Sequence, residues 1–388
     1  MFSMNRTISN TGTGEMTVSA ILPRTGAEIK RINRGLIFPS AAFTVRPRQV
    51  KFYCLSDKPP RVGDVVYGVV DRIGQHSSLE NASGRIHEIH HGTKAVFIFG
   101  NRYAPDFFEG LVPDKMVSGA DLLARSGMIG VVKTKNSLVK DATRVNVLGY
   151  ICDERGNILN TRDCPLVKPR STIKKQPRSP MILVCGTSMN SGKSMAAAAC
   201  CWALKSLGYN VRASKVTGTA SLKDILHMND AGADPYADFT YLGYPSTYML
   251  SEAQLLDIFN NLDLKYANNP KNFWVVELAD GVIQRETAML LSSGQVVQRI
   301  HKLIFCSYDA FGAIGGLRTL SERFNLVPDA VSGVCSSSPL LIRELSAFTN
   351  IPVFNSVETD VNRLGEILLC PSRRKQDRNI VDGEIVSC

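Results

Sequence analysis

The chain has 388 residues, which exceeds the usual size of one domain, so two domains are expected. A hydrophobic fraction of 44% and a charged fraction of 21% exclude a disordered or fibrous protein. The sequence contains no run of about 18 apolar residues and no signal-peptide pattern at its start. These features predict a cytoplasmic protein without a membrane partner.

The formal net charge of +10 comes entirely from the first half of the chain. Residues 1–180 hold 27 Lys and Arg against 15 Asp and Glu, and the remaining residues hold 18 against 20. An excess of this kind suits a polyanion, so nucleic acid is a candidate partner. A solvated basic surface is the alternative, and it is slightly favoured.

The sequence pattern of the first half predicts β structure. Residues 1–20 are polar and are expected to form a flexible N-terminus, whereas residues 21–167 show short apolar runs between turn residues, which is typical of a small β-barrel or sandwich. Part of this region, residues 62–113, resembles an oligonucleotide-binding barrel. The predicted strands are Gly35–Phe38, Val50–Leu55, Asp64–Ile73, Lys94–Phe99, Gly127–Lys133 and Arg144–Cys152.

The second half alternates strand and helix patterns. A linker is expected at residues 168–180 (KPRSTIKKQPRSP), an α/β domain at 181–370, and a tail at 371–388. The alternation predicts a mainly parallel sheet with helices on both faces. The predicted strands are Met181–Cys185, Val211–Lys215, Phe273–Glu277, Lys302–Cys306, Ala330–Val334 and Ile351–Phe354. The predicted helices are Lys193–Leu207, Ser251–Asn261, Gln284–Leu291, Ala313–Arg323, Leu340–Phe348 and Asp360–Leu368.

The first strand of this half leads into GTSMNSGKS at residues 186–194, called the phosphate loop below, and then into an Ala-rich helix. A strand, a Gly-rich turn and a helix form the setting in which a G-K-[ST] sequence (Walker A) binds a nucleotide. Lys193 would pair with the β and γ phosphates, and Ser194 Oγ would bind Mg²⁺. The expected nucleotide-binding residues are Gly186, Thr187, Ser188, Met189, Asn190, Ser191, Gly192, Lys193 and Ser194.

Two charged residues stand at the ends of neighbouring predicted strands. A carboxylate at Glu277 can orient Mg²⁺ when it faces a helix N-terminus that holds phosphates. A cation at Lys215 would lie near the γ-phosphate and stabilise charge on a transferring phosphoryl group. The alternatives are a solvated acid at Glu277 and an ordinary surface lysine at Lys215.

The phosphate loop has five residues between Gly186 and Gly192, one more than the common Walker A pattern. It resembles the G-T-x-x-x-x-G-K-[ST] loop of dethiobiotin synthetase and the cobyrinic and cobyric acid synthases, in the branch of P-loop proteins that includes the MinD-like ATPases. The segment 213–216 (ASKV) is similar to the K-P-V segment of dethiobiotin synthetase, which implies a catalytic role for Lys215 beside Lys193.

The same resemblance implies a metal site. Asp224, in SLKDIL, is placed like the family's Mg²⁺-binding aspartate, and Glu277 is placed like its second acidic ligand, so Ser194, Asp224 and Glu277 are the expected Mg²⁺ ligands. A residue without a metal role is an equal alternative for Asp224. Leu278 and Asp280 stand where the family has glycines. The resemblance covers about half of the chain, residues 181–352.

These features favour a Mg²⁺- and ATP-dependent ligase or synthetase, which activates a carboxylate or carbamate of a small-molecule substrate by phosphoryl transfer. GTP is not excluded as the nucleotide, because ATP is favoured over it by the resemblance alone. The sequence contains no N-K-x-D segment of the kind that recognises guanine in many GTPases. The alternative is a nucleotide-switched NTPase whose basic N-terminal domain binds nucleic acid or a protein. The resemblance also implies a homodimer.

Two further segments carry weaker signals. His87 to His91 fits the zinc-protease pattern H-E-x-x-H, but the glycines around it predict a strand and turn instead of the helix that zinc binding needs. The long insertion at residues 217–269 is expected to form a functional loop or lid. Its acids Asp230, Asp234 and Asp238 are candidates to bind a metal ion or a cationic substrate, and a solvated acidic loop is the favoured alternative.

Overall fold

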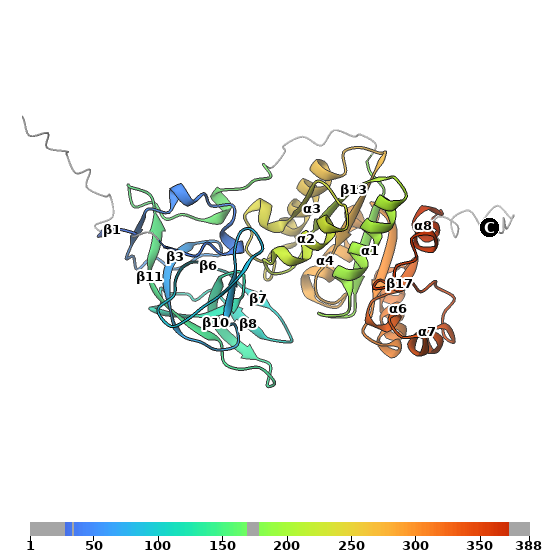
Figure 1. Ribbon diagram of the computed structural model, residues 1–388, viewed down its shortest axis with the longest axis horizontal. Coiled ribbons are helices and arrows are strands. Elements are labelled where there is room, and N and C mark those ends of the chain that lie inside the picture. The colour runs from blue at the N-terminus through green and yellow to red at the C-terminus, as the bar shows by residue number, and fades with distance from the viewer. Residues whose placement is uncertain (1–27, 33–34, 169–177, 372–388) are drawn as a thin grey trace, which may run out of the picture.

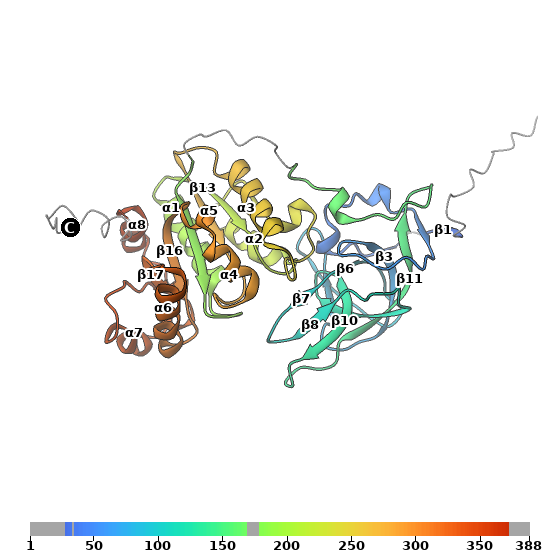
Figure 2. The same ribbon diagram turned by 180° about the vertical axis from the view of Figure 1, so that it is seen from behind.

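The computed structural model describes residues 28–32, 35–168 and 178–371. The expectations for residues 1–20, for most of the linker and for nearly all of the tail lie outside this part. Figure 1 shows two halves side by side, a β-rich N-terminal half and a C-terminal half with a helix-covered sheet. The view from behind in Figure 2 shows the same division.

The C-terminal half is mixed α/β and contains a six-stranded parallel sheet, in the order β14-β13-β15-β12-β16-β17. Five of these strands coincide with predicted ones. The predicted strand Ile351–Phe354 forms only an isolated parallel bridge, from Val353 to Val331. The strands are β12 (Met181–Gly186), β13 (Asn210–Lys215), β14 (Tyr236–Asp238), β15 (Asn272–Glu277), β16 (Ile300–Cys306) and β17 (Ala330–Ser332).

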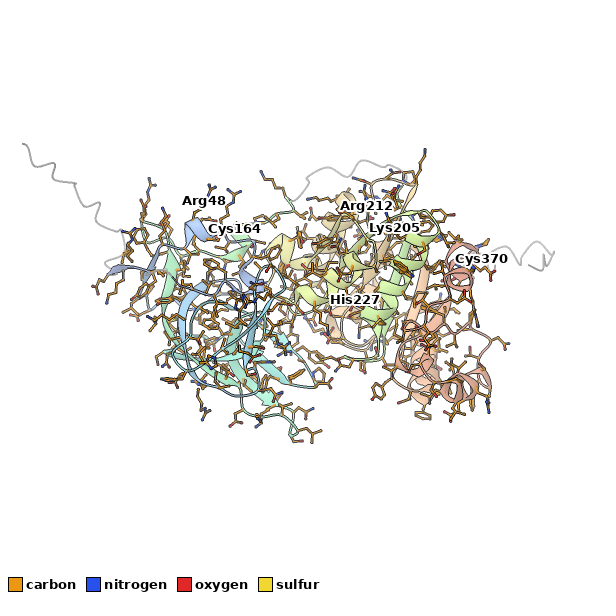
Figure 3. All side chains as sticks on the ribbon, viewed as in Figure 1. Arg48, Cys164, Lys205, Arg212, His227 and Cys370 are labelled. Atoms are coloured by element: carbon orange, nitrogen blue, oxygen red, sulfur yellow. The ribbon has the colours of Figure 1, made fainter. Side chains whose placement is uncertain are left out.

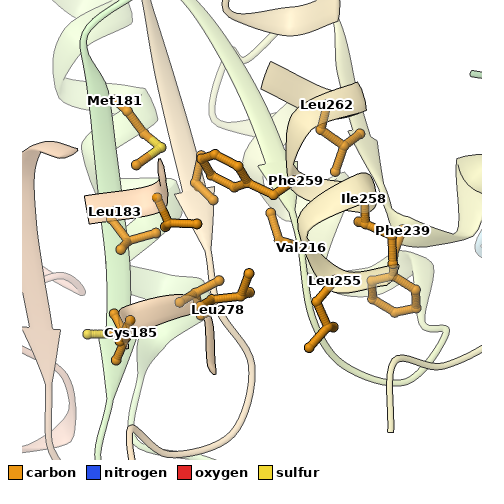
Figure 4. Packing of buried hydrophobic residues seen from close by; sticks show 14 of the residues in the cluster. Met181, Leu183, Cys185, Val216, Phe239, Leu255, Ile258, Phe259, Leu262 and Leu278 are labelled. Atoms are coloured by element: carbon orange, nitrogen blue, oxygen red, sulfur yellow. The ribbon is translucent and has the colours of Figure 1, made fainter. Parts of the chain in front are cut away.

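Helices cover both faces of this sheet, as predicted. Ile182 and Val184 of β12 pack under the helices of one face, and Leu183 and Cys185 pack under those of the other. Both faces of the strand are therefore buried, which explains why it reads as a continuous apolar run. The first face carries α1 (Lys193–Ser206), α2 (Leu222–Asp230) and α8 (Val361–Leu369). The second, whose packing Figure 4 shows, carries α3 (Glu252–Tyr266), α4 (Arg285–Ser292), α5 (Gly294–Val297) and part of α6 (Ala310–Phe324).

The insertion at residues 217–269 is largely regular structure and not a lid. It contains α2, the edge strand β14 and α3, and the Ser251 hydroxyl caps α3 by accepting a hydrogen bond from the Gln254 N–H at 3.3 Å. Asp230 and Asp234 are exposed as expected. Asp238 is not: it is buried and accepts hydrogen bonds from the N–H and hydroxyl of Thr240. The three-residue edge strand β14, which ends at Asp238, places this acid inside the protein.

In the N-terminal half, five strands pair in a closed circuit, β3-β6-β10-β9-β11 and back to β3. Five of the six predicted strands are formed, and residues 35–38 contribute only a bridge from Ile37 to Ala95. The strands are β1 (Ile29–Arg31), β2 (Phe52–Cys54), β3 (Val65–Arg72), β4 (Ser78–Glu80), β5 (Ile86–Glu88), β6 (Lys94–Phe99), β7 (Arg102–Tyr103), β8 (Phe108–Leu111), β9 (Gly119–Ala124), β10 (Met128–Lys135) and β11 (Thr143–Cys152).

The H-E-x-x-H segment lies in a strand and a turn, as predicted, because His87 belongs to β5. In the described part of the chain, no group of three or more His, Cys, Asp or Glu side chains is placed to hold a metal ion. No described helix has both the length and the apolar character that a membrane span requires.

The two halves are joined by direct hydrogen bonds. Glu80 of β4 accepts from the N–H of Leu222 at the start of α2, at 3.0 Å. The Thr161 hydroxyl donates to the Gly243 carbonyl oxygen at 2.7 Å. Near the phosphate loop, Asn190 Nδ2 donates to Asp106 Oδ2 at 2.5 Å. Both views place β7 on the side of the N-terminal half that faces the sheet half (Figures 1 and 2).

Candidate functional site

The phosphate loop connects the carboxyl end of β12 to the first turn of α1. The Thr187 N–H donates to the Cys306 carbonyl oxygen of β16 at 2.9 Å, which ties the start of the loop to the next strand. At its end, Gly192 has φ of 95°, a left-handed conformation that glycine adopts without strain. The first N–H groups of α1 have no acceptor within the helix. The loop therefore presents donors and a positive helix end to an anion.

Two neighbouring loops support the phosphate loop. After β15, the Val282 N–H donates to the Gly186 carbonyl oxygen at 2.9 Å, and an added Cβ at Gly281 would lie 2.1 Å from the Thr187 oxygen. After β17, Gly333 has φ of 100°, and its Cβ would lie 2.2 Å from the Ser191 oxygen. Only glycine permits these approaches. Neither support was predicted from the sequence: Gly281 lies four residues beyond the predicted strand Phe273–Glu277, and Gly333 lies inside the predicted strand Ala330–Val334.

Lys193 and Ser194 open α1 and turn toward different neighbours. Lys193 Nζ donates to the Ser188 carbonyl oxygen at 2.5 Å, so the ammonium folds back over the loop. Burial lowers its pKa. Ser194 Oγ lies 3.1 Å from Glu277 Oε1 and 3.4 Å from Asp224 Oδ1. The structure thus brings the predicted hydroxyl and both predicted carboxylates together.

Lys215 lies between the same two carboxylates. Its Nζ forms an ion pair with Asp224 and stands 3.5 Å from Glu277 Oε1. Burial would lower the Lys215 pKa, but the two carboxylates outweigh it and hold that pKa above its ordinary value, so the ammonium stays charged. The Lys215 and Glu277 side chains are only 8% and 1% exposed. The surface-lysine and solvated-acid alternatives are therefore wrong for these two positions.

The carboxylates have the chemistry that Mg²⁺ requires. Glu277 Oε2 is buried and has no hydrogen-bond partner in the described structure, and burial raises the pKa of this carboxyl. Such a group gains from a nearby cation. One hydroxyl and two carboxylates would leave the remaining positions of an octahedral Mg²⁺ to phosphate oxygens and water. The residues fit the predicted ion.

Ser188 and Asn190 of the phosphate loop make polar contacts outside the cluster of Ser194, Asp224 and Glu277. Ser188 Oγ donates to the Met189 carbonyl oxygen at 3.0 Å, and Asn190, at φ of 61°, reaches Asp106 of the N-terminal half.

A separate cavity of about 240 Å³ lies between α6 and the segment that follows α7 (Pro339–Ser346). Its lining includes Ile314, Leu317 and Phe348 and none of the predicted site residues.

Two charged residues beside the loop were not predicted as functional. Asp280 follows β15 at φ of 58° and is half-buried. Burial raises its pKa to about 6, opposed by the charges of Lys193, Lys215 and Arg102. Arg102, on β7 of the other half, is 7% exposed. Asp280 was noted only as a departure from a glycine of the resembled family, and no motif marks Arg102, which acts on Asp280 electrostatically from the other half.

Comparisons with known proteins add little. No protein-family model matches the chain, and no curated protein matches it. Two solved structures of the signal recognition particle receptor FtsY from Elizabethkingia anophelis are similar over 53% of this chain. The structure in complex with GDP has 11% sequence identity to this chain and a TM-score of 0.34, and the match covers 68% of that receptor chain. The other structure has 14% identity and a TM-score of 0.32, and the match covers 70% of its chain. Similarity at this level leaves the activity to be argued from the residues of this chain.

Proposed function

We propose that the chain binds a nucleoside triphosphate with Mg²⁺ at the phosphate loop and transfers the γ-phosphoryl group to a small-molecule acceptor. The observation that carries the proposal is a group of five side chains, Lys193, Ser194, Lys215, Asp224 and Glu277, called the sheet-side cluster below. Lys215 and Glu277 end the neighbouring strands β13 and β15, Ser194 opens α1 and Asp224 lies in α2, and these four side chains meet within hydrogen-bond or ion-pair distance. Lys193, which precedes Ser194, acts on Glu277 through its charge.

Each member has a role in this proposal. The loop N–H groups and Lys193 bind the β and γ phosphates, and Ser194, Asp224 and Glu277 are the Mg²⁺ ligands. An ion held by these three residues would supply positive charge that offsets the charge of the phosphates. Lys215, which stays protonated, stabilises the negative charge of the transferring group and holds both carboxylates in place.

The reaction class rests on the resemblance of residues 181–352 to the dethiobiotin synthetase branch. Lys215, Asp224 and Glu277 occupy the positions that match that branch, which favours activation of a carboxylate or carbamate by ATP. The same geometry serves GTP equally well, because the cluster contacts phosphates and not the base. A homodimer belongs to this proposal by the same resemblance, and light scattering that shows a monomer with nucleotide bound would count against it.

A nucleotide-switched binding protein is the second candidate, and one contact favours it. Asn190 of the phosphate loop is hydrogen-bonded to Asp106 of the N-terminal half. A conformational change of the loop on nucleotide binding would therefore alter a contact with that half. The N-terminal half also exposes basic side chains such as Arg48 (Figure 3). This candidate requires salt-sensitive oligonucleotide binding by the full chain that changes with nucleotide.

The central test is ligand-induced thermal stabilisation. We expect Mg·ATP or Mg·GTP to raise the midpoint of thermal unfolding of the wild type, and Lys193→Ala to abolish that rise, because a ligand that binds only the folded state stabilises it. Lys205→Ala is the matched control, since Lys205 lies exposed in the last turn of the same helix (Figure 3). A wild type that neither nucleotide stabilises would contradict the proposal.

A further inference from the structure

A β-hairpin of the N-terminal half reaches the phosphate loop. Strands β7 and β8 pair antiparallel, and the turn between them carries Asp106. We call residues 102–111 the β7–β8 hairpin. Its turn is fixed within the N-terminal half, because the N–H of Asn136 donates to the Phe107 carbonyl oxygen at 2.9 Å and Asn136 Nδ2 donates to the Pro105 carbonyl oxygen at 3.0 Å. Asp106 is therefore held at a defined place next to the phosphate loop.

The hairpin contacts the phosphate loop through one side-chain hydrogen bond. Asp106 Oδ2 accepts from Asn190 Nδ2 at 2.5 Å. Asp106 is half-buried, whereas Asn190 is exposed in the middle of the loop. Among the described residues, Asp106 forms no salt bridge that would draw its carboxylate away from Asn190. A carboxylate at this place needs an explanation, because its charge by itself opposes the phosphates that the loop would bind.

The conformation of Asn190 supplies that explanation. Its φ of 61° is uncommon for a residue with a side chain, and such conformations persist where the surroundings enforce them. Left-handed residues in a turn direct successive backbone N–H groups to one side, where they form a concavity for an anion. The bond from Asp106 holds the Asn190 side chain, so it favours the backbone conformation that shapes this concavity.

The two halves of the protein hold different parts of the loop. The sheet half holds its ends, because the Thr187 N–H donates to the Cys306 carbonyl oxygen and the Ser191 carbonyl oxygen accepts from the Val334 N–H at 3.3 Å. The side chain of Asn190, between these two points, is held from the N-terminal half. A loop that is fixed in its binding conformation before the ligand arrives binds more tightly, because a larger fraction of the free protein is ready to bind.

We propose that Asp106 is a positioning residue of the nucleotide site. Acting through Asn190, it holds the middle of the phosphate loop in the conformation that receives the phosphates. The group that matters is the acceptor oxygen of Asp106 and not its charge. The N-terminal half is thereby part of the same nucleotide site as the sheet-side cluster. This inference rests on the proposed function, because it concerns the binding of the same nucleotide.

The test is calorimetric titration of the full-length chain with Mg·ATP and with Mg·GTP, followed by the variants with whichever nucleotide binds the wild type. Asp106→Ala removes the acceptor and should weaken binding by roughly 3- to 10-fold, the range of one hydrogen bond to a charged group at a partly exposed site. Asp106→Asn keeps an acceptor oxygen and removes the negative charge, so it should bind at least as tightly as the wild type.

Tyr248→Phe is the matched control, because it loosens the same hairpin without touching Asp106. The Tyr248 hydroxyl, on the sheet half, donates to Glu109 Oε1 of the hairpin at 2.9 Å, and phenylalanine lacks this donor. If Asp106 acts through Asn190, Tyr248→Phe leaves the nucleotide affinity unchanged. A weakening equal to that of Asp106→Ala would show that the general seating of the hairpin matters instead, and it would overturn the inference.

A double-mutant cycle tests the route through Asn190. Asn190→Gly permits the left-handed conformation and lacks the side-chain donor, so Asp106→Ala should cause no further loss of affinity in that background. The inference is also overturned if Asp106→Ala binds as the wild type does, if Asp106→Asn is as weak as Asp106→Ala, or if Asp106→Ala weakens the Asn190→Gly protein by the same factor as the wild type. A wild type that binds neither nucleotide would instead remove the proposed function, so the two failures are distinguishable.

Discussion

The two sides of the phosphate loop hold charge in opposite ways. On the sheet side, Lys215 is paired with Asp224 and lies close to Glu277, and Ser194 bridges the two carboxylates. On the side of the N-terminal half, Arg102 is buried and Asp280 is half-buried, and no ion pair between them is found among the described residues. The first side is a connected network, and the second is an open pair.

This difference separates two tasks. A connected network of buried charges is held in one geometry, and removing one member leaves the others uncompensated. It suits a site that must hold an ion and phosphates in fixed positions. Charges that are removed from water without a direct partner lower folding stability. The comparison predicts that substitutions on the two sides change stability in opposite directions.

The largest effect is expected at Lys215. Lys215→Met should lower the free energy of unfolding by about 3–5 kcal/mol, because Asp224 and Glu277 would be left buried without a cation. Urea unfolding at pH 7.5 measures it, with Lys271→Met as a control at an exposed lysine of the same half. If the two variants unfold at the same urea concentration, the network does not stabilise the fold as described.

A smaller effect of opposite sign is expected at Asp280. Its pKa is raised to about 6, so between about pH 4 and pH 6 the folded chain binds a proton that the unfolded chain releases. Wild-type stability therefore falls as pH rises through this window, and the loss persists above it. Asp280→Asn lacks that loss and should be more stable than the wild type by about 1–3 kcal/mol at pH 8 and by little near pH 4.

The groups that act on Asp280 include Lys193, Lys215 and Arg102, whose positive charges lower its pKa, and Glu286, whose charge raises it. Urea unfolding of both proteins at pH 4, 6 and 8 measures the difference. Asp230→Asn is a control, because Asp230 is exposed at the end of α2. An Asp280→Asn variant that is no more stable than the wild type at pH 8 would show that the charge of Asp280 does not reduce the folding stability.

Much of the sheet half could be predicted from local patterns. Continuous apolar runs such as β12 mark strands that are buried on both faces, and the glycines at 186 and 192 mark the turn between strand and helix. Lys215 and Glu277 could be singled out because each ends a predicted strand, and parallel strands bring their carboxyl ends to one edge of the sheet.

Other features depend on packing that a single sequence does not reveal. Asp238 reads as an acid in a polar loop, yet a three-residue edge strand and Thr240 bury it. The predicted strand at residues 351–354 has the composition of a strand but pairs at one point only. Arg102 and Asp280 act on each other electrostatically, and no periodicity or motif connects residues that far apart in the sequence.

The measurement that tests the central claim most directly is calorimetric titration of ATP and of GTP, with Mg²⁺ and with EDTA, into the wild type and Glu277→Gln. If Ser194, Asp224 and Glu277 hold the ion, at least one nucleotide binds the wild type more tightly with Mg²⁺ than with EDTA. The ratio of these two affinities should be at least about tenfold smaller for Glu277→Gln than for the wild type. Equal affinities with Mg²⁺ and EDTA, or a wild type that binds neither nucleotide, would contradict the account.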